Sequence, residues 1–240
     1  MKQLIILCLL TCLSSFCLAQ SYTLITTLPS KAVKGEKSSA SFFVEIMEET
    51  FIRSGLALRT EKGHWIANQK KVISASPSKG FVITPLTRTK EREDAYDWIL
   101  PITNYKLQFI TNDKSIDITN LEDLKTQPVC AYRESPAEYQ LRDLGFTKIR
   151  TKVQEQKCFQ GLKKQTTKVM LAHGKLAAIQ GYKLIGGNPE QLIYGRSFAE
   201  EILYLASTKG AVSPEDKKKL ADAFDAMKID GTYKRIFDTY

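Results

Sequence analysis

Arg92 is the residue of this sequence whose chemistry most clearly suggests a binding site, and it stands in the charged segment 87–93. A guanidinium can hold a carboxylate through two parallel hydrogen bonds. Such a fork replaces the water that an anion loses on burial, a loss that is otherwise costly. The alternative is that Arg92 forms a surface ion pair with Glu91 or Glu93.

A second candidate anion site begins at Ser135. The run Ser135-Pro136-Ala137-Glu138 has the spacing of a capping box at a helix start and follows a predicted strand that ends at Tyr132. Free backbone N–H groups and the helix dipole at such a start attract negative charge. Ser135 is equally suited to a purely structural role as the helix cap.

The sequence offers little for catalysis or metal binding. His64 and His173 are the only histidines, and neither has a partner at metal-ligand spacing. There is no G-x-S-x-G, no H-E-x-x-H, no P-loop and no dinucleotide glycine fingerprint. We therefore expect no catalytic residue, no metal and no cofactor.

Strand-like and helix-like segments alternate along the chain, which predicts an α/β architecture. The expected strands span residues 21–27, 56–59, 81–84, 105–111, 129–132, 148–153, 175–180 and 201–207. Apolar residues at helical spacing predict a first helix that ends at Gly55. Further helices are expected at 136–144, at 156–173 and from Ser213-Pro214 to Gly231.

The order of these elements predicts two nested lobes. The first lobe comprises residues 20–104 and 202–240, and the second comprises residues 105–201 inserted between them. The strands near 105–111 and 201–207 would be the crossings. A ligand of such a protein lies in the cleft between the lobes, where closure buries it.

The N-terminus has the pattern of a secretory signal. Lys2 precedes the apolar run 4–10, and small residues at Cys17 and Ala19 predict cleavage after Ala19. The run is too short for a stable membrane span. We expect the remaining chain in the bacterial periplasm.

Two cysteines remain after cleavage. Cys130 and Cys158 would then stand in an oxidising compartment, where an even pair is typical of a disulfide. They fall on neighbouring predicted elements of the second lobe, a strand and a helix. Two separate buried thiols are the alternative.

The formal charge of +9 does not indicate nucleic-acid binding, because the lysines are scattered along the chain. A nucleic-acid footprint would be concentrated and interleaved with aromatic residues. Solvated basic faces and a mild preference for anionic ligands are what this composition predicts.

Several motifs follow one another in the order of a known family. Trp98 and Pro101 come soon after Arg92, and the segments 174–178 and 227–236 follow at the expected places. In these motifs the sequence resembles the family 3 extracellular solute-binding proteins, the amino-acid-binding type II periplasmic receptors of ABC transporters. The resemblance covers nearly all of the chain after the signal.

This resemblance implies a two-lobed periplasmic-binding-protein (Venus flytrap) fold with two crossing strands between the lobes. It implies a monomer, and no enzyme, that captures a small polar, carboxylate-bearing ligand such as an amino acid for an inner-membrane ABC permease. One alternative is a receptor of the same fold that serves a sensor protein without a transporter. The other is a secreted dehydratase-type enzyme on this fold.

The resemblance also implies which residues hold the ligand. Arg92 and Thr87 are expected to bind its carboxylate from the first lobe. Arg133 and Ser135 are expected to contact it from the second lobe. Glu134 stands where the family usually has glycine, which alters the space or the charge of the cleft.

Three aromatic residues complete the expected site. Trp65 lies near the position of the family's aromatic platform, although a lone Trp is commonly a core residue, and Tyr132 is open to the same two interpretations. Tyr182, with Gln180 nearby, stands where amino-acid binders place the aspartate that holds the ligand's ammonium group. Ala177 also replaces the motif's own aspartate, so a zwitterionic ligand would lose its charge partner.

Overall fold

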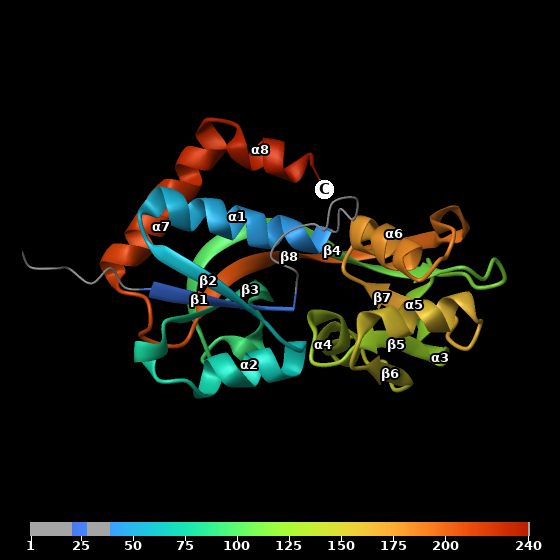
Figure 1. Ribbon diagram of the computed structural model, residues 1–240. Helices are drawn as coiled ribbons and strands as arrows, with labels where there is room; N and C mark the ends of the chain where they lie inside the picture. The colour runs from blue at the N-terminus through green and yellow to red at the C-terminus, as the bar shows by residue number, and fades with distance from the viewer. Residues whose placement is uncertain (1–20, 28–38, 240) are drawn as a thin grey trace, which may run out of the picture.

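The computed structural model describes residues 21–27 and 39–239. The signal segment predicted for residues 1–19 lies outside them. Within the described residues, eight strands form one mixed sheet in the order β2-β1-β3-β8-β4-β7-β5-β6, with helices packed along it (Figure 1). No helix in these ranges is both long and apolar enough to cross a membrane.

The first lobe is built from both ends of the chain. It contains the elements β1 (Ser21–Thr26), α1 (Ser39–Ser54), β2 (Ala57–Lys62), α2 (Trp65–Ser74), η1 (Pro77–Lys79), β3 (Phe81–Thr87), η2 (Lys90–Arg92), α7 (Pro214–Ile229) and α8 (Thr232–Phe237). Strand β1 pairs in parallel with β2 and β3. The side chain of Ser213 accepts a hydrogen bond from the backbone N–H of Asp216 and so caps α7.

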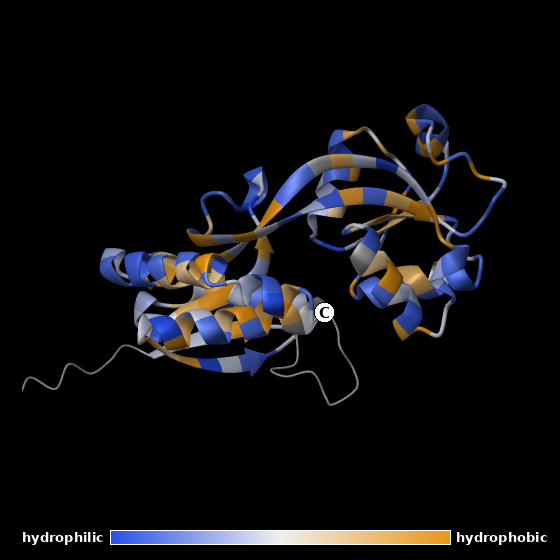
Figure 2. Ribbon diagram, turned by 90° about the horizontal axis from the view of Figure 1, so that it is seen from above, coloured by the Kyte–Doolittle hydropathy of each residue, from blue (hydrophilic) through white to orange (hydrophobic). Residues whose placement is uncertain are grey.

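Two long antiparallel strands join the lobes. Strands β4 (Asp97–Thr111) and β8 (Ile193–Ser207) pair along their length, from Asp97 opposite Ser207 to Thr111 opposite Ile193. Figure 2 shows them as two adjacent bands that bridge the lobes. The predicted crossings lie within these strands, and β4 begins earlier than the sequence indicated.

The second lobe lies between the two long strands in the chain. It contains α3 (Leu121–Thr126), β5 (Val129–Tyr132), α4 (Pro136–Asp143), β6 (Ile149–Lys152), α5 (Glu155–Lys163), β7 (Val169–Ala172), α6 (Lys175–Leu184) and η3 (Pro189–Gln191). Strand β5 pairs in parallel with β6 and β7, and β7 pairs antiparallel with β4. Parallel strands linked by helices give the α/β architecture expected for this lobe.

Each lobe has apolar cores of its own. Tyr22, Phe51 and Phe224 belong to a cluster in the first lobe, and Phe109 and Leu141 belong to one in the second. This division agrees with a nested two-lobe organisation. The lobe boundaries predicted between residues 104 and 105 and between residues 201 and 202 stay a prediction.

The predicted disulfide is present. Cys130 on β5 and Cys158 on α5 are bonded, with their Cα atoms 5.7 Å apart, and both lie fully buried in the same apolar cluster. The bond ties a helix to the sheet of the second lobe. It lies in the core and has no exposed thiol for redox chemistry.

Two secondary-structure predictions are wrong. The helix predicted for 156–173 ends at Lys163, because the backbone turns at Gln165 (φ 59°) and the amides of Thr166 and Thr167 bond back to Gly161. The apolar run that follows is strand β7, and a short apolar run does not distinguish a buried strand from a helix. The strand predicted for 175–180 is helix α6.

Candidate functional site

A cavity of about 590 Å³ lies between the two lobes and against the long strands. The side chains that line it come from both lobes and include Phe42, Phe43, Trp65, Thr87, Arg92, Tyr105, Lys106, Gln108, Tyr132, Ser135, Glu155, His173 and Lys175. Its volume lies in the range of cavities that enclose small organic ligands. Five of the seven ligand-binding residues predicted from the sequence line it: Trp65, Thr87, Arg92, Tyr132 and Ser135.

Arg92 ends the η2 turn and is only 4 % exposed. Its Nη1 donates to the main-chain carbonyl of Thr87 (3.1 Å), and its Nη2 donates across the lobes to the carbonyl of Glu134 (2.6 Å). The guanidinium also lies 5.4 Å from the centre of the Trp65 ring. Burial lowers the pKa of Arg92 from its ordinary value, because the charged form loses hydration.

The surface ion pair considered for Arg92 does not form. Glu93 instead receives two hydrogen bonds from Arg88, at 2.8 and 2.5 Å. No carboxylate in the described residues comes within ion-pair distance of Arg92, and its Nε is buried without a hydrogen-bond partner. A buried guanidinium with unused donors at a cavity wall is suited to receive an anionic group.

Thr87 of the first lobe and Tyr105 of the long strand β4 add a hydroxyl pair beside this cation. The side-chain hydroxyls of Thr87, at the end of β3, and Tyr105, on β4, are hydrogen-bonded to each other at 2.9 Å. Both residues line the cavity. Burial raises the pKa of Tyr105, so its hydroxyl keeps its proton and can act as a donor. Tyr105 was predicted only as part of a strand, since nothing local in the sequence marks it as a cavity residue.

Ser135 is the N-cap residue of α4, but the predicted capping box does not form. Its Oγ donates to the carbonyl of Tyr132 (2.6 Å), and the carboxylate of Glu138 accepts from the backbone N–H of Glu134 (2.8 Å). The reason is the left-handed turn at Glu134 (φ 53°), a conformation that favours glycine. Ser135 is buried and lines the cavity.

Trp65 and Tyr132 face each other from opposite lobes. Trp65 begins α2 and Tyr132 ends β5, and their ring centroids lie 6.3 Å apart. Burial raises the pKa of Tyr132. Together they form an aromatic wall of the cavity.

The structure does not place Arg133 or Tyr182 at the cavity. Arg133 is exposed and its Nε donates weakly to the Thr151 hydroxyl (3.4 Å). Tyr182 is 1 % exposed within the second lobe's core, where its hydroxyl accepts from Asn112 (3.0 Å). The sequence count reached Tyr182 because it treated residues 175–180 as a strand.

The cavity residues that the sequence interpretation missed lie mainly on the second lobe. His173 follows the carboxyl end of β7, and Glu155 begins α5; His173 Nδ1 lies 2.8 Å from Glu155 Oε1. Lys106 and Lys175 add two positive charges to the lining. A correct assignment of β7 would have pointed to His173, because ligands of α/β folds gather at the carboxyl ends of parallel strands.

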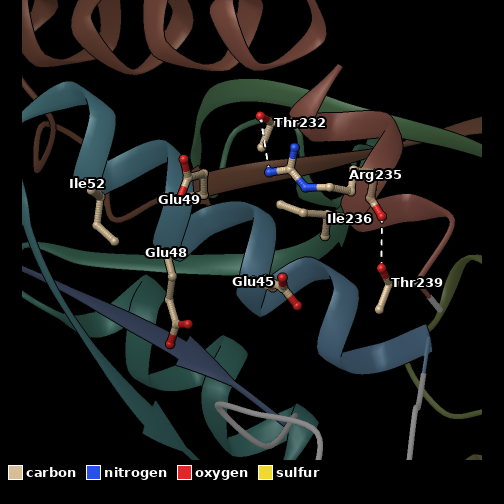
Figure 3. Close-up of a pocket in the computed structure, with 8 residues that line it drawn as sticks. All are labelled: Glu45, Glu48, Glu49, Ile52, Thr232, Arg235, Ile236 and Thr239. Carbon is tan, nitrogen blue, oxygen red and sulfur yellow. Dashed lines mark hydrogen bonds between the residues drawn. The ribbon is translucent and has the colours of Figure 1, made fainter. Parts of the chain in front are cut away.

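A second hollow of about 290 Å³ lies between α1 and α8 (Figure 3). Its polar groups bond to their neighbours: Arg235 contacts the Thr232 hydroxyl (3.4 Å), Thr239 donates to the Arg235 carbonyl (2.8 Å), and Glu49 pairs with Arg53. We assign no site to this hollow.

No protein-family model and no curated protein matches the chain. Solved structures resemble it over nearly their whole length. An ancestral arginine-binding protein bound to arginine has a TM-score of 0.74 at 21 % identity, covering 92 % of this chain and 98 % of that one. The sensor domain of a histidine kinase similar to periplasmic binding proteins has a TM-score of 0.76 at 15 % identity, covering 90 % and 94 %.

A third similar structure is the ligand-binding core of GluR0 from Nostoc punctiforme, in complex with L-glutamate. It has a TM-score of 0.73 at 17 % identity and covers 91 % of this chain and 98 % of that one. These likenesses define the fold: the chain has the two-lobed architecture of periplasmic binding proteins. The fold class predicted from the sequence is thereby confirmed.

Proposed function

We propose that this protein is a periplasmic solute-binding protein of the family 3 type, which captures a small carboxylate-bearing ligand and performs no chemistry on it. One observation carries the proposal. Arg92 is buried at the wall of an interlobe cavity, has no carboxylate partner among the described residues, and keeps unused N–H donors. Burying a cation in this way is costly unless an anion binds beside it.

The two lobes would hold the ligand between them. Arg92 and the Thr87–Tyr105 hydroxyl pair would bind its carboxylate from the first lobe. Ser135, at the start of α4, would close on it from the second lobe. The rings of Trp65 and Tyr132 would flank its apolar part.

The ligand would pass to an inner-membrane ABC permease, and the receptor would act as a monomer without nucleic acid. The similarity to a histidine kinase sensor domain supports a second role, in which the bound receptor signals to a sensor protein. Deleting the gene separates the two roles. Loss of ligand uptake supports transport, whereas loss of a transcriptional response with unchanged uptake supports sensing.

The periplasmic location follows from the signal segment at residues 1–19. Intact mass measurement of the protein secreted by a bacterial host tests it. A chain that begins at Gln20 supports the proposal, and a full-length chain in the cytosol contradicts it.

Substituting Arg92 tests the binding proposal. Native mass spectrometry of the freshly purified protein would first identify any bound small molecule, and a panel of carboxylates would supply further ligands. We expect Arg92→Ala to abolish the ligand-induced rise in melting temperature while the protein stays folded. Arg150→Ala is the matched control, because Arg150 lies exposed on β6 away from the cavity. An equal thermal shift in both variants would remove Arg92 from the site.

A further inference from the structure

The charges that line the interlobe cavity are unequal. Arg92, Lys106 and Lys175 bring three positive charges, of which the Lys175 ammonium lies 5.1 Å from the centre of the Tyr194 ring, and Glu155 is the one carboxylate among the described residues that line it. Glu155 is already engaged, because its Oε1 lies 2.8 Å from His173 Nδ1. An ammonium group on a ligand would therefore meet cations and a carboxylate that holds an imidazole.

Other carboxylates near the cavity do not change this balance. Glu201 on β8 does not line it. The carboxylate of Glu138 accepts hydrogen bonds from the Arg142 guanidinium and from the backbone N–H of Glu134. Within the described residues, no side chain therefore offers an unengaged negative charge to the cavity.

Much of the rest of the wall is aromatic. Trp65 and Phe43 from the first lobe, Tyr105 from β4 and Tyr132 from the second lobe all line it. A cavity of about 590 Å³ leaves room for a ring beyond the group that Arg92 would hold. Planar apolar groups pack well against such side chains.

We propose that the ligand is a carboxylate that lacks an ammonium group and carries a planar apolar body, such as an aryl 2-oxo or 2-hydroxy acid. This inference rests on the proposed function, since Arg92 takes the carboxylate. The neighbouring 2-oxo or 2-hydroxy oxygen then accepts hydrogen bonds from a cationic N–H of the lining, where an ammonium group would be repelled.

Matched acids test the inference by isothermal titration calorimetry on the purified protein. Phenylpyruvate, phenyllactate and L-phenylalanine differ only at the 2-position, and 2-oxoglutarate and L-glutamate form a second series without a ring. We expect phenylpyruvate or phenyllactate to bind at least about tenfold more tightly than L-phenylalanine, because the lining repels the ammonium. We also expect either aryl acid to bind more tightly than 2-oxoglutarate.

The outcomes separate this inference from the proposed function. Binding of L-phenylalanine or L-glutamate as tight as that of its oxo acid, and lost in Arg92→Ala, would overturn the inference and leave the function standing. Tighter binding of 2-oxoglutarate than of both aryl acids would overturn the part of the inference that gives the ligand a planar apolar body. Failure of every acid to bind would count against both proposals.

His173 provides a variant that should reverse the preference. His173→Asp places a carboxylate at the carboxyl end of β7, so we expect the affinity for L-phenylalanine relative to phenylpyruvate to rise about tenfold or more. His173→Asn also releases Glu155 from the imidazole but adds no charge, so it should raise this ratio less than His173→Asp does. If the affinity for L-phenylalanine relative to phenylpyruvate is the same in both variants as in the parent protein, the second lobe's charge does not select the ligand. That result would contradict the inference.

Discussion

The guanidinium of Arg92 in the first lobe donates a 2.6 Å hydrogen bond to the main-chain carbonyl of Glu134 in the second lobe. The bond links the two lobes at a point where Glu134 adopts a left-handed backbone conformation (φ 53°). One side chain thus serves both as the charge at the cavity wall and as a contact between the lobes. We therefore expect anion binding at Arg92 to be coupled to the relative position of the lobes.

Tyr96 is buried and its hydroxyl has no hydrogen-bond partner, so Tyr96→Phe should stabilise the fold at neutral pH by about 1 kcal/mol. Burial raises the pKa of Tyr96 to about 12, above its ordinary value of 10.0. The folded state therefore favours the neutral phenol. The parent protein keeps its full stability with respect to this titration below pH 10 and loses stability as the pH rises toward 12.

Thermal melting from pH 8 to 12 measures both effects. The Phe variant should lose less stability than the parent protein over the alkaline range. A melting temperature several degrees below that of the parent protein at neutral pH would mean that the hydroxyl has a partner and would contradict the prediction.

The Cys130–Cys158 bond should contribute roughly 3–4 kcal/mol to the free energy of unfolding, because it closes a loop of 28 residues in the unfolded chain. Urea unfolding of the oxidised and reduced protein measures this difference. A double Cys→Ser variant should match the reduced form. Two thiols that react with iodoacetamide in the unfolded, unreduced protein would show that the bond is absent.

Helix α6 packs closely on α5, and Gly181 permits the contact. A Cβ atom at Gly181 would lie 2.2 Å from the ring of the buried Phe159. We expect Gly181→Ala to lower the free energy of unfolding by about 1–3 kcal/mol through overpacking. Lys183→Ala, exposed on the same helix, is the control and should have little effect. Equal stability of both variants would contradict this helix packing.

Local sequence patterns predicted the elements whose ends carry strong signals. Ser213-Pro214 and Gly231 bracket α7, and Pro136 marks the start of α4. Cys130 and Cys158 were paired because two cysteines on neighbouring elements of a secreted lobe suffice for that prediction. Arg92 was predicted as a ligand contact because its own segment carries the family's motif, and it lines the cavity.

Two second-lobe residues of the cavity lining, Glu155 and His173, could not be predicted in the same way. Glu155 and His173 are 18 residues apart and meet only because α5 and β7 are adjacent in the fold. The apolar run of β7 fits a helix as well as a buried strand. With that run assigned to a helix and residues 175–180 to a strand, the count along the chain reached Tyr182, which lies in the core.

The claim that Arg92 holds the ligand's carboxylate is tested most directly by a two-by-two comparison in isothermal titration calorimetry. The best-binding carboxylic acid and its uncharged primary amide are each titrated into the parent protein and into Arg92→Ala. We expect amidation to weaken binding to the parent protein by about 100-fold, since a buried charge pair is lost, and to change binding to the variant little. An equal effect of amidation on both proteins would contradict the account.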